Sequence, residues 1–500
     1  MANTFYLDAE HGDDGASGTT PSQAWRTLAR AMEQPLRPGD ALLLKRGCVW
    51  QGTFRLRGRG ERGRPITLGT YGAGPKPRLV ADAYPVIGND GPVSFWHIKG
   101  LELRGAEAYD PHGREPRQEH GIHIHHAGGA ASCGMVIEDC VIHDLGGTGI
   151  VFSAGELGAT AHRGFCVTRC EIYNAGTGIA THGPWPPGSD LARIHPCHAD
   201  FRVEHCQVHD LAADGIVLSC CQDGVIEHCR AWRTGIGRVR RTPVGIWYYL
   251  AARCLIQFCE SYDNHTAGGE ADGGGFDLDG GCIDCIMQYN YSHDNDGAGF
   301  LICSYNPADA PTAGCVTRYN LSVNDGRMND YASIFIWQAD GCLTHNNTCI
   351  TRISSCLKFT SDSRGHLFAN NIFVVDAAAD IPVLQSAFGL NENRFEHNLY
   401  WRTGGGVSFR LKDAPRVEFA DAAAFFQSKN ELYADPRLSA LSGPDIHLLQ
   451  GSPALGRGRR LEDMGGRDLY GLPVGKRGAV NIGASQRRPR GPAAAGPYPS

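Results

Sequence analysis

A short pattern of apolar and polar positions recurs along most of the chain. Two apolar residues are followed by one or two polar residues, then by Cys or Asn, and then by an apolar residue. Ten copies occur at intervals of 23–36 residues. Their Cys or Asn residues are Cys140, Cys170, Cys206, Cys229, Cys259, Asn290, Asn320, Asn347, Asn371 and Asn398. Self-similarity at such intervals indicates a repeat architecture.

A second element follows each copy and alternates strictly between apolar and variable residues. It opens with a small residue, usually Gly, as in Gly215-Ile-Val-Leu-Ser219 and Gly275-Phe-Asp-Leu-Asp279. Period-two alternation predicts a strand with one buried face. Short strands at a variable repeat, without helical periodicity between them, predict an all-β solenoid of the parallel β-helix type. A propeller fits less well because its blades need about 40–45 residues.

The Cys or Asn position predicts an interior ladder. Equivalent residues of successive coils stack about 4.8 Å apart, so Asn side chains can hydrogen-bond along the stack, while a buried Cys acts as a small apolar residue. A zinc site is the weaker interpretation, because the only CxxC segment is Cys282-Ile-Asp-Cys285 and no second pair stands at zinc spacing. The 19 Cys are therefore expected to be mostly stacked thiols.

The chain organisation follows from the repeat. A chain of 500 residues is long for one ordinary core, but a solenoid grows in one dimension. We expect a β-helix with an N-terminal cap over residues 1–430, a tail packed on it over 431–486, and disorder over 487–500. The cap is predicted as a helix from Ser22 to Met32 with Ser22 as its N-cap. Two turn insertions (184–198 and 232–243) and a short helix (Phe419–Lys429) complete the prediction.

The repeat and the opening segment together resemble a known family. The opening contains Phe5-Tyr-Leu-Asp8, Gly12-Asp-Asp14, Ala24-Trp-Arg-Thr-Leu28 and Pro38-Gly-Asp40. Over roughly residues 5–430 the chain resembles the pectate-lyase-like superfamily of right-handed parallel β-helices. The resemblance implies a polysaccharide or oligosaccharide partner. It is less specific for the reaction, because this superfamily includes lyases, hydrolases, epimerases and viral adhesins.

The outward-facing positions of the Gly-led strands form a column, in which acidic and aromatic side chains are concentrated in a few neighbouring coils. Two acidic residues, Asp277 and Asp279, follow the aromatic pair Trp247 and Tyr249 by one coil. Because Asp is rare in strands and two like charges on one face repel, this pair is predicted to carry proton transfers in catalysis. The further positions predicted to contact substrate are Trp247, Tyr249, Trp337, His293, Asp272 and Lys358.

The turns beside these strands add more acidic residues. Glu270 and Asp272 precede the Asp277 strand, whereas Asp294 and Asp296 precede the next one. Asp294 and Asp296 are predicted to assist catalysis, or to form a cation site together with Asp272. Asp before Gly is also ordinary turn chemistry, so a purely structural role for these turn residues stays open.

Three functions remain open on these residues, led by a glycoside hydrolase that uses paired Asp carboxylates and no cofactor. The first alternative is a polysaccharide lyase or uronate epimerase using Ca²⁺, for which the nearest outward Lys, Lys358, stands three coils from Asp277. The second is a non-catalytic glycan-binding protein. The outward histidines His123 and His125 lie five coils from Asp277 and are interpreted as polar surface or a distal sugar contact.

Charge and hydropathy exclude other partners. The formal net charge is −6, with 47 basic and 53 acidic residues, which does not provide the basic surface of a nucleic-acid-binding protein. No stretch reaches the 18 or so apolar residues of a membrane-spanning helix. No signal peptide is recognised, and the Cys usage favours a cytoplasmic protein, with a secreted protein lacking its signal as the alternative.

Overall fold

The structure is a computed structural model that describes residues 2–155, 160–184, 196–237, 242–269, 271–304, 308–360, 363–377, 381–386, 392–411, 417–418, 426, 428 and 430–487. The chain divides into two compact units. Unit 1 comprises Met1–Arg230 and Thr234–Arg240, and unit 2 comprises Ala231–Arg233 and Arg241–Ser500. The division falls within β22 (Arg230–Trp232). The predicted insertion at 184–198, the helix over Phe419–Lys429 and the terminal segment 487–500 lie mostly outside the described residues. Residues 238–241 of the predicted insertion at 232–243 also lie outside them.

Unit 1 is a stack of short parallel strands. One series pairs in chain order and consists of β1 (Thr4–Leu7), β2 (Ala41–Lys45), β5 (Ile66–Tyr71), β8 (Trp96–Lys99), β12 (Val136–Glu138), β15 (Cys166–Thr168), β18 (Arg202–Glu204) and β21 (Val225–Glu227). The other strands are β3 (Val49–Gln51), β4 (Phe54–Leu56), β6 (Arg78–Val80), β7 (Ile87–Asn89), β9 (Glu102–Arg104), β10 (Ile122–His126), β11 (Ser132–Cys133), β13 (Val141–Ala154), β14 (His162–Arg163), β16 (Glu171–His182), β17 (His198–Ala199), β19 (Gln207–Leu211) and β20 (Ile216–Gln222). All of the pairings described between these strands are parallel.

The predicted N-terminal helix is wrong in its extent and its cap. Instead of one helix from Ser22, the structure has a 3₁₀ turn η1 (Pro21–Gln23) and a helix α1 (Leu28–Met32). Thr27 is the N-cap of α1, and its hydroxyl accepts a hydrogen bond from the Arg30 N–H at 3.2 Å. Trp25 lies between the two elements in extended backbone, because its N–H donates to Tyr6 and its carbonyl accepts from Asp8. These bonds to the β1 segment interrupt the helix.

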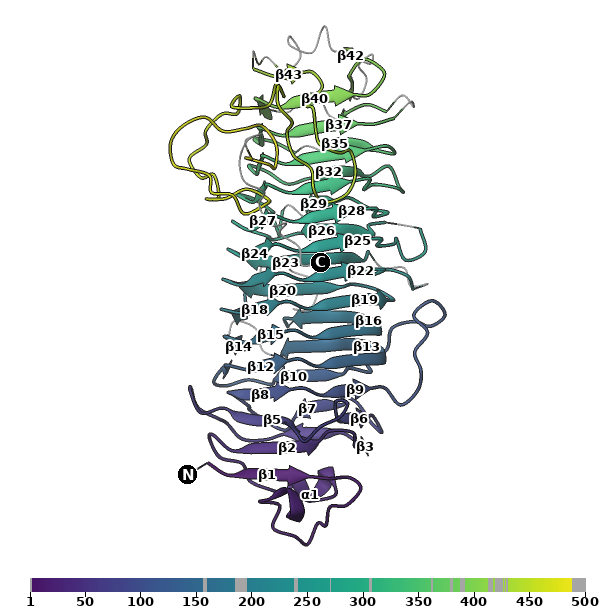
Figure 1. The fold of residues 1–500 in the computed structure, drawn as a ribbon, viewed down its shortest axis with the longest axis vertical. Helices are drawn as coiled ribbons and strands as arrows, with labels where there is room; N and C mark the ends of the chain where they lie inside the picture. Colours follow the sequence, from purple (N-terminus) through teal and green to yellow (C-terminus); the bar gives the residue numbers. More distant parts are fainter. Residues whose placement is uncertain are drawn as a thin grey trace. The chain divides into compact units, whose positions relative to one another are not determined.

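Unit 2 repeats the same arrangement, and its strands form three series. The first is β24 (Leu255–Gln257), β27 (Ile286–Gln288), β30 (Val316–Arg318), β33 (Leu343–His345), β36 (Leu367–Ala369) and β39 (Arg394–Glu396). The second is β25 (Glu260–Tyr262), β28 (Tyr291–His293), β31 (Leu321–Val323), β34 (Thr348–Thr351), β37 (Ile372–Val375), β40 (Leu399–Arg402) and β43 (Leu432–Tyr433). The third is β23 (Val244–Ala252), β26 (Gly274–Leu278), β29 (Phe300–Cys303), β32 (Ala332–Trp337), β35 (Ser355–Thr360), β38 (Leu384–Ser386) and β41 (Ser408–Leu411), which also pairs antiparallel with β42 (Val417–Glu418). Strands β26, β29, β32 and β35 rise one above another in this unit (Figure 1).

The predicted ladder occupies the interior of each unit. Cys140, Cys170, Cys206 and Cys229 are buried in unit 1, and Cys259 and Asn290 are buried in unit 2. In unit 2 the ladder continues as hydrogen-bonded amides, each Nδ2 donating to the Oδ1 of the next at 2.9–3.1 Å: Asn290, Asn320, Asn347, Asn371 and Asn398. The prediction of stacked interior residues is therefore confirmed within each unit.

Asn320 illustrates why Asn suits this position. Its Nδ2 donates to the Met287 carbonyl and to Asn347, while its Oδ1 accepts from both the backbone N–H and the Nδ2 of Asn290. All four hydrogen-bonding positions of the amide are thus satisfied. A buried amide satisfied in this way avoids the cost of unpaired polar groups, so the amide fixes the register of successive coils.

The segment after residue 430 packs on unit 2. Its buried apolar residues, which include Ile446, Leu469 and Ile482, form one core cluster with Tyr319 and Leu321 of the coils. Polar contacts add to this packing, because the Tyr289 hydroxyl donates to the Gly465 carbonyl at 2.6 Å. The yellow C-terminal segment lies beside the coils of unit 2 in Figure 1.

All nineteen cysteines lie in the described part of the chain, and none of them forms a disulfide there. Seventeen are buried, which agrees with thiols used as small apolar core residues. Among the described residues, no helix combines the length and the hydropathy required to cross a membrane.

Candidate active site

The third strand series of unit 2 builds a polar and aromatic surface on one side of the coils. Inward residues such as Ile246, Phe276 and Ile302 are buried in the core. Alternation then directs their neighbours outward. Strand register aligns Trp247 with Asp277, Asp277 with Leu301, and Leu301 with Phe335. A parallel column carries Tyr249, Asp279, Cys303 and Trp337, of which Cys303 and Trp337 are paired directly. This alignment confirms the predicted outward column within unit 2.

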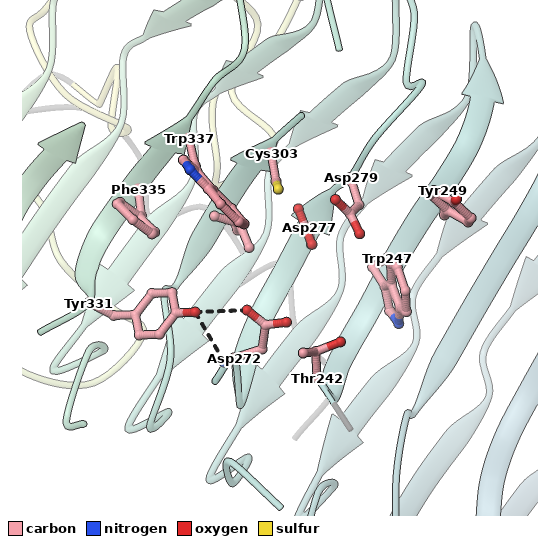
Figure 2. Close-up of a pocket in the computed structure, with 11 residues that line it drawn as sticks. Thr242, Trp247, Tyr249, Asp272, Asp277, Asp279, Cys303, Tyr331, Phe335 and Trp337 are labelled. Carbon is pink, nitrogen blue, oxygen red and sulfur yellow. Dashed lines mark hydrogen bonds between the residues drawn. The ribbon is translucent and has the colours of Figure 1, made fainter. Parts of the chain in front are cut away.

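A pocket of about 410 Å³ opens over these columns. It is lined by Thr242, Trp247, Tyr249, Asp272, Asp277, Asp279, Leu301, Cys303, Tyr331, Phe335 and Trp337. Figure 2 shows the three carboxylates in the middle, with Trp247 and Tyr249 on one side and Phe335 and Trp337 on the other. The volume is typical of small-molecule sites, which range over about 300–1,000 Å³.

Asp277 lies in the pocket but is not exposed, contrary to the sequence-based expectation. The residue is only 2% accessible, and its Oδ1 has no hydrogen-bond partner in the described part of the chain. Burial raises the pKa of Asp277 well above its usual range, and the charges of Asp279 and Asp272 raise it further. The expectation was wrong because alternation along one strand predicts only the side of the sheet on which a side chain lies. Whether that side chain is also buried depends on other segments of the chain.

Asp279 is more accessible than Asp277, since it is only partly buried. Its Oδ1 accepts a hydrogen bond from the Gly280 N–H at 2.7 Å, and the Cys303 thiol is a second partner. Burial raises the pKa of Asp279 to about 7, although both hydrogen bonds oppose that rise. A carboxyl with a pKa close to neutrality can act as a proton donor.

Asp272 joins the same pocket from the turn before β26. The Tyr331 hydroxyl donates to its Oδ1 at 2.9 Å and accepts from its backbone N–H at 3.1 Å (Figure 2). Burial raises the pKa of Asp272, while hydrogen bonds from Tyr331 and Thr242 lower it. This carboxyl is therefore fixed in position and partly stabilised in its ionised form.

Sequence reasoning missed five of the lining residues as site residues: Thr242, Leu301, Cys303, Tyr331 and Phe335. Phe335 lies in the outward column by its register with Leu301, but it was not among the predicted substrate contacts. Tyr331 gave no signal, because it precedes β32 in a turn and reaches Asp272 across 59 positions of sequence. Such a contact becomes visible only when the register of the coils is known.

The other predicted turn residues lie apart from this pocket. Asp296 interacts with His265 at 3.2 Å and with Arg327 at 3.1 Å, and the Arg327 and His265 charges help to lower its pKa. Asp294 interacts with His293 at 2.9 Å, and His293 also interacts with Glu260. None of Asp294, Asp296 and His293 is among the described residues that line the pocket.

A shared cation site at Asp272, Asp294 and Asp296 is therefore not formed. Each carboxylate has its own separate partners, and no group of three or more His, Cys, Asp or Glu side chains in the described chain could hold a metal ion. Among those described residues, the donors that Ca²⁺ requires, six to eight oxygens around one point, do not converge. This corrects the predicted metal site.

Lys358 is also outside the pocket lining, although its register follows the prediction. It pairs with Phe335 in the strand alignment, and its Nζ lies 5.6 Å from the Phe335 ring centroid. Its ammonium group binds Asp330 at 2.6 Å. Of the described residues that line the pocket, none carries a positive charge.

The histidines of unit 1 form a separate cluster. His123 and His125 both contact the Ser153 hydroxyl, at 2.7 and 2.9 Å. Burial lowers the pKa of His123 to about 4, and neighbouring His charges lower it further. These imidazoles are consistent with the expected polar surface, and they do not form a metal cluster among the described residues.

Comparisons with known proteins agree with the fold. A family model described as a right handed beta helix region matches residues 187–348. A lacto-N-biosidase from Bifidobacterium longum subsp. longum is 23% identical over 468 residues, which cover 74% of this chain and 29% of that protein. The chain thus spans less than a third of the length of this curated relative.

Two solved structures share the architecture. The GH136 lacto-N-biosidase from Eubacterium ramulus is 18% identical, with a TM-score of 0.54 over 86% of this chain and 67% of the other. The complex of XylC with xylose has 12% identity and a TM-score of 0.58, covering 97% of this chain and 98% of the other. Together with the family model and the parallel stacking of the strands, this likeness confirms the predicted right-handed parallel β-helix.

Proposed function

We propose that this chain is a glycoside hydrolase that cleaves a sugar chain bound in the pocket over β23, β26, β29 and β32. The observation that carries the proposal is the group of three carboxyl groups, Asp272, Asp277 and Asp279, inside an aromatic-lined pocket. Paired carboxylates with different proton affinities are what glycoside hydrolysis requires. The likeness to lacto-N-biosidases, which are glycan-cleaving enzymes by name, supports the same reaction class.

Asp279 is proposed as the proton donor. With a pKa near 7, it holds a proton at or below neutral pH and can deliver it to the leaving glycosidic oxygen as the C–O bond breaks. Asp272 is proposed to supply the carboxylate that stabilises positive charge at the anomeric carbon. Water then adds its hydroxide to that carbon, and its remaining proton returns to a carboxylate. The second catalytic carboxyl group is thus proposed to be Asp272 and not the predicted Asp277. Asp272 is more accessible than Asp277 and has hydrogen bonds that favour its ionised form.

The bound sugar is proposed to be neutral. Three acidic groups line the pocket, and no basic side chain does so among the described residues. A uronate carboxylate would therefore meet repulsion without a compensating cation. The absence of a basic side chain from this described lining also disfavours the lyase and epimerase alternatives, which abstract a proton next to a carboxylate.

Trp247→Ala is expected to weaken substrate binding by about 2 kcal/mol, the scale of an aromatic hot spot. Trp247 flanks the carboxylates in Figure 2 and is partly accessible, so its ring can stack against a sugar face. The measurement is KM on the best substrate, with thermal unfolding as the check on the fold. An unchanged KM would mean that the ring only covers the coil.

Product analysis tests the proposed reaction. The wild-type chain would be incubated with p-nitrophenyl β-glycosides of neutral mono- and disaccharides, with lacto-N-biose among them, and with polyuronates as comparison substrates. We expect new reducing ends from a neutral glycoside, no absorbance in the unsaturated-uronate band, and the same rate in EDTA. Unsaturated product or loss of activity in EDTA would indicate a lyase, whereas binding without turnover would indicate a glycan-binding protein.

A further inference from the structure

We infer that Asp277 binds the sugar in the pocket as a neutral carboxylic acid, through the oxygen that has no partner among the described residues. This inference rests on the proposed function and names a specificity-determining residue for it. It separates the role of Asp277 from the proton transfer assigned to Asp279. The chemical group recognised is a hydroxyl or amide on the sugar whose glycosidic bond is cleaved.

The geometric basis is a buried, unsatisfied oxygen on a side chain that lines a cavity. Asp277 Oδ1 is buried and lacks a hydrogen bond, while the side chain lines the pocket. Buried polar atoms are nearly always paired, so an unpaired one calls for an explanation, such as a role in catalysis. A sugar hydroxyl over β26 would provide the missing partner.

The surroundings explain why the group is neutral. The titratable groups that line the pocket with Asp277 are Asp279 directly after the same strand, Asp272 in the preceding turn, Tyr331 beside Asp272, Cys303 on β29 and Tyr249 on β23. All five are acids, and no cation is present in the described lining. Burial and the charges of Asp279 and Asp272 accordingly raise the pKa of Asp277 well above its usual range, which favours its protonated, neutral form.

A protonated carboxyl can donate one hydrogen bond and accept others, whereas a carboxylate only accepts. Neutral Asp277 can therefore receive a hydroxyl group in either orientation without adding a charge next to the Asp272 carboxylate. Since the strand pairing aligns it between Trp247 and Leu301, the contact would lie at the centre of the pocket floor. That position would select sugars with a polar substituent there.

The test compares Asp277→Asn with Asp277→Leu, using Asp279→Asn as the reference for lost proton transfer. The Asn amide keeps a donor and an acceptor without charge, so kcat/KM on the best p-nitrophenyl glycoside of the panel should fall by about tenfold or less. Leu has a similar volume but no polar atom, so it should cost about 5- to 150-fold, mainly through KM. The basic limb of the pH–rate profile should remain in Asp277→Asn and be lost in Asp279→Asn.

Two outcomes would overturn the inference. A loss in Asp277→Asn as large as that in Asp279→Asn, together with a lost basic limb, would make Asp277 the proton donor. Wild-type KM in Asp277→Leu would mean that the side chain does not touch the sugar. A wild-type chain inactive on the whole panel would instead refute the proposed function itself, so the two failures are distinguishable.

A second measurement needs no substrate. A pKa raised by folding contributes stability at low pH that is lost as the pH rises above the unfolded value of about 3.9. Asp277→Asn has no carboxyl group at this position, so it does not lose this stability as the pH rises. Its Tm should therefore exceed that of the wild type at pH 7, and the difference should vanish near pH 4. A lower Tm for Asp277→Asn at pH 7 would show an ionised, favourably paired Asp277 and would contradict the inference.

Discussion

Asp279→Asn is expected to lower kcat by about 10²–10⁴-fold, the range that general acid catalysis contributes. Asn has nearly the shape of Asp but cannot release a proton at neutral pH, so the acceptor for the Gly280 N–H remains. In the wild type, activity should fall as the pH rises through about 7, because Asp279 then loses the proton that the leaving oxygen needs. Stopped assays from pH 5 to 9 on the best substrate of the panel measure both effects.

Asp294→Asn is the matched control for this change. It makes the same chemical substitution one coil away, on a carboxylate that binds His293 and lies outside the described pocket lining. Turnover of this variant should stay near that of the wild type. Near-normal turnover in Asp279→Asn, or an equal loss in both variants, would contradict the role assigned to Asp279.

Folding and catalysis make opposite demands on Asp279. Its raised pKa means that the folded state holds a proton which the unfolded chain has released, so stability declines as the pH rises from about 4 to 7. Replacing the residue with Asn removes that penalty. We therefore expect Asp279→Asn to unfold at a higher temperature than the wild type at pH 8 while losing turnover. Such a result is expected for a functional carboxyl group that lowers the stability of the fold.

The repeat in the sequence was sufficient to predict the fold and the side of each strand. Alternation in Gly275-Phe-Asp-Leu-Asp279 placed Phe276 inward and the carboxylates outward, and the register then aligned them with the aromatic residues of β23 and β32. These features depend on local periodicity and on stacking between equivalent positions. Both are properties of a single strand and its nearest coil, so they can be read from sequence.

Features that depend on contacts between distant segments could not be predicted in this way. The turn carboxylates Asp272 and Asp296 precede Gly in equivalent turns, yet one meets Tyr331 in the pocket and the other meets Arg327 and His265 away from it. Their different surroundings come from side chains that the repeat does not specify. The same reason explains the unexpected burial of Asp277.

Asp272→Asn is expected to lower kcat by an amount similar to Asp279→Asn, about 10²–10⁴-fold, but with the opposite pH signature. Asp272 must be ionised to stabilise positive charge at the anomeric carbon, so the wild-type rate should fall on the acidic side as this carboxylate gains a proton. Asp272→Asn should remove that acidic limb and retain the basic limb due to Asp279.

Tyr331→Phe tests the role of the hydrogen bond to Asp272 while the Asp272 carboxyl group itself is kept. The variant keeps the ring but loses the hydroxyl that donates to Asp272 Oδ1 at 2.9 Å. Because that bond favours the ionised form and lowers the pKa of Asp272, its loss should raise the pKa and move the acidic limb to higher pH, with kcat reduced by about tenfold. An acidic limb that stays in place in Tyr331→Phe would mean that Asp272 is not the group titrating there. The carboxylate that stabilises the developing charge would then have to be sought elsewhere in the pocket.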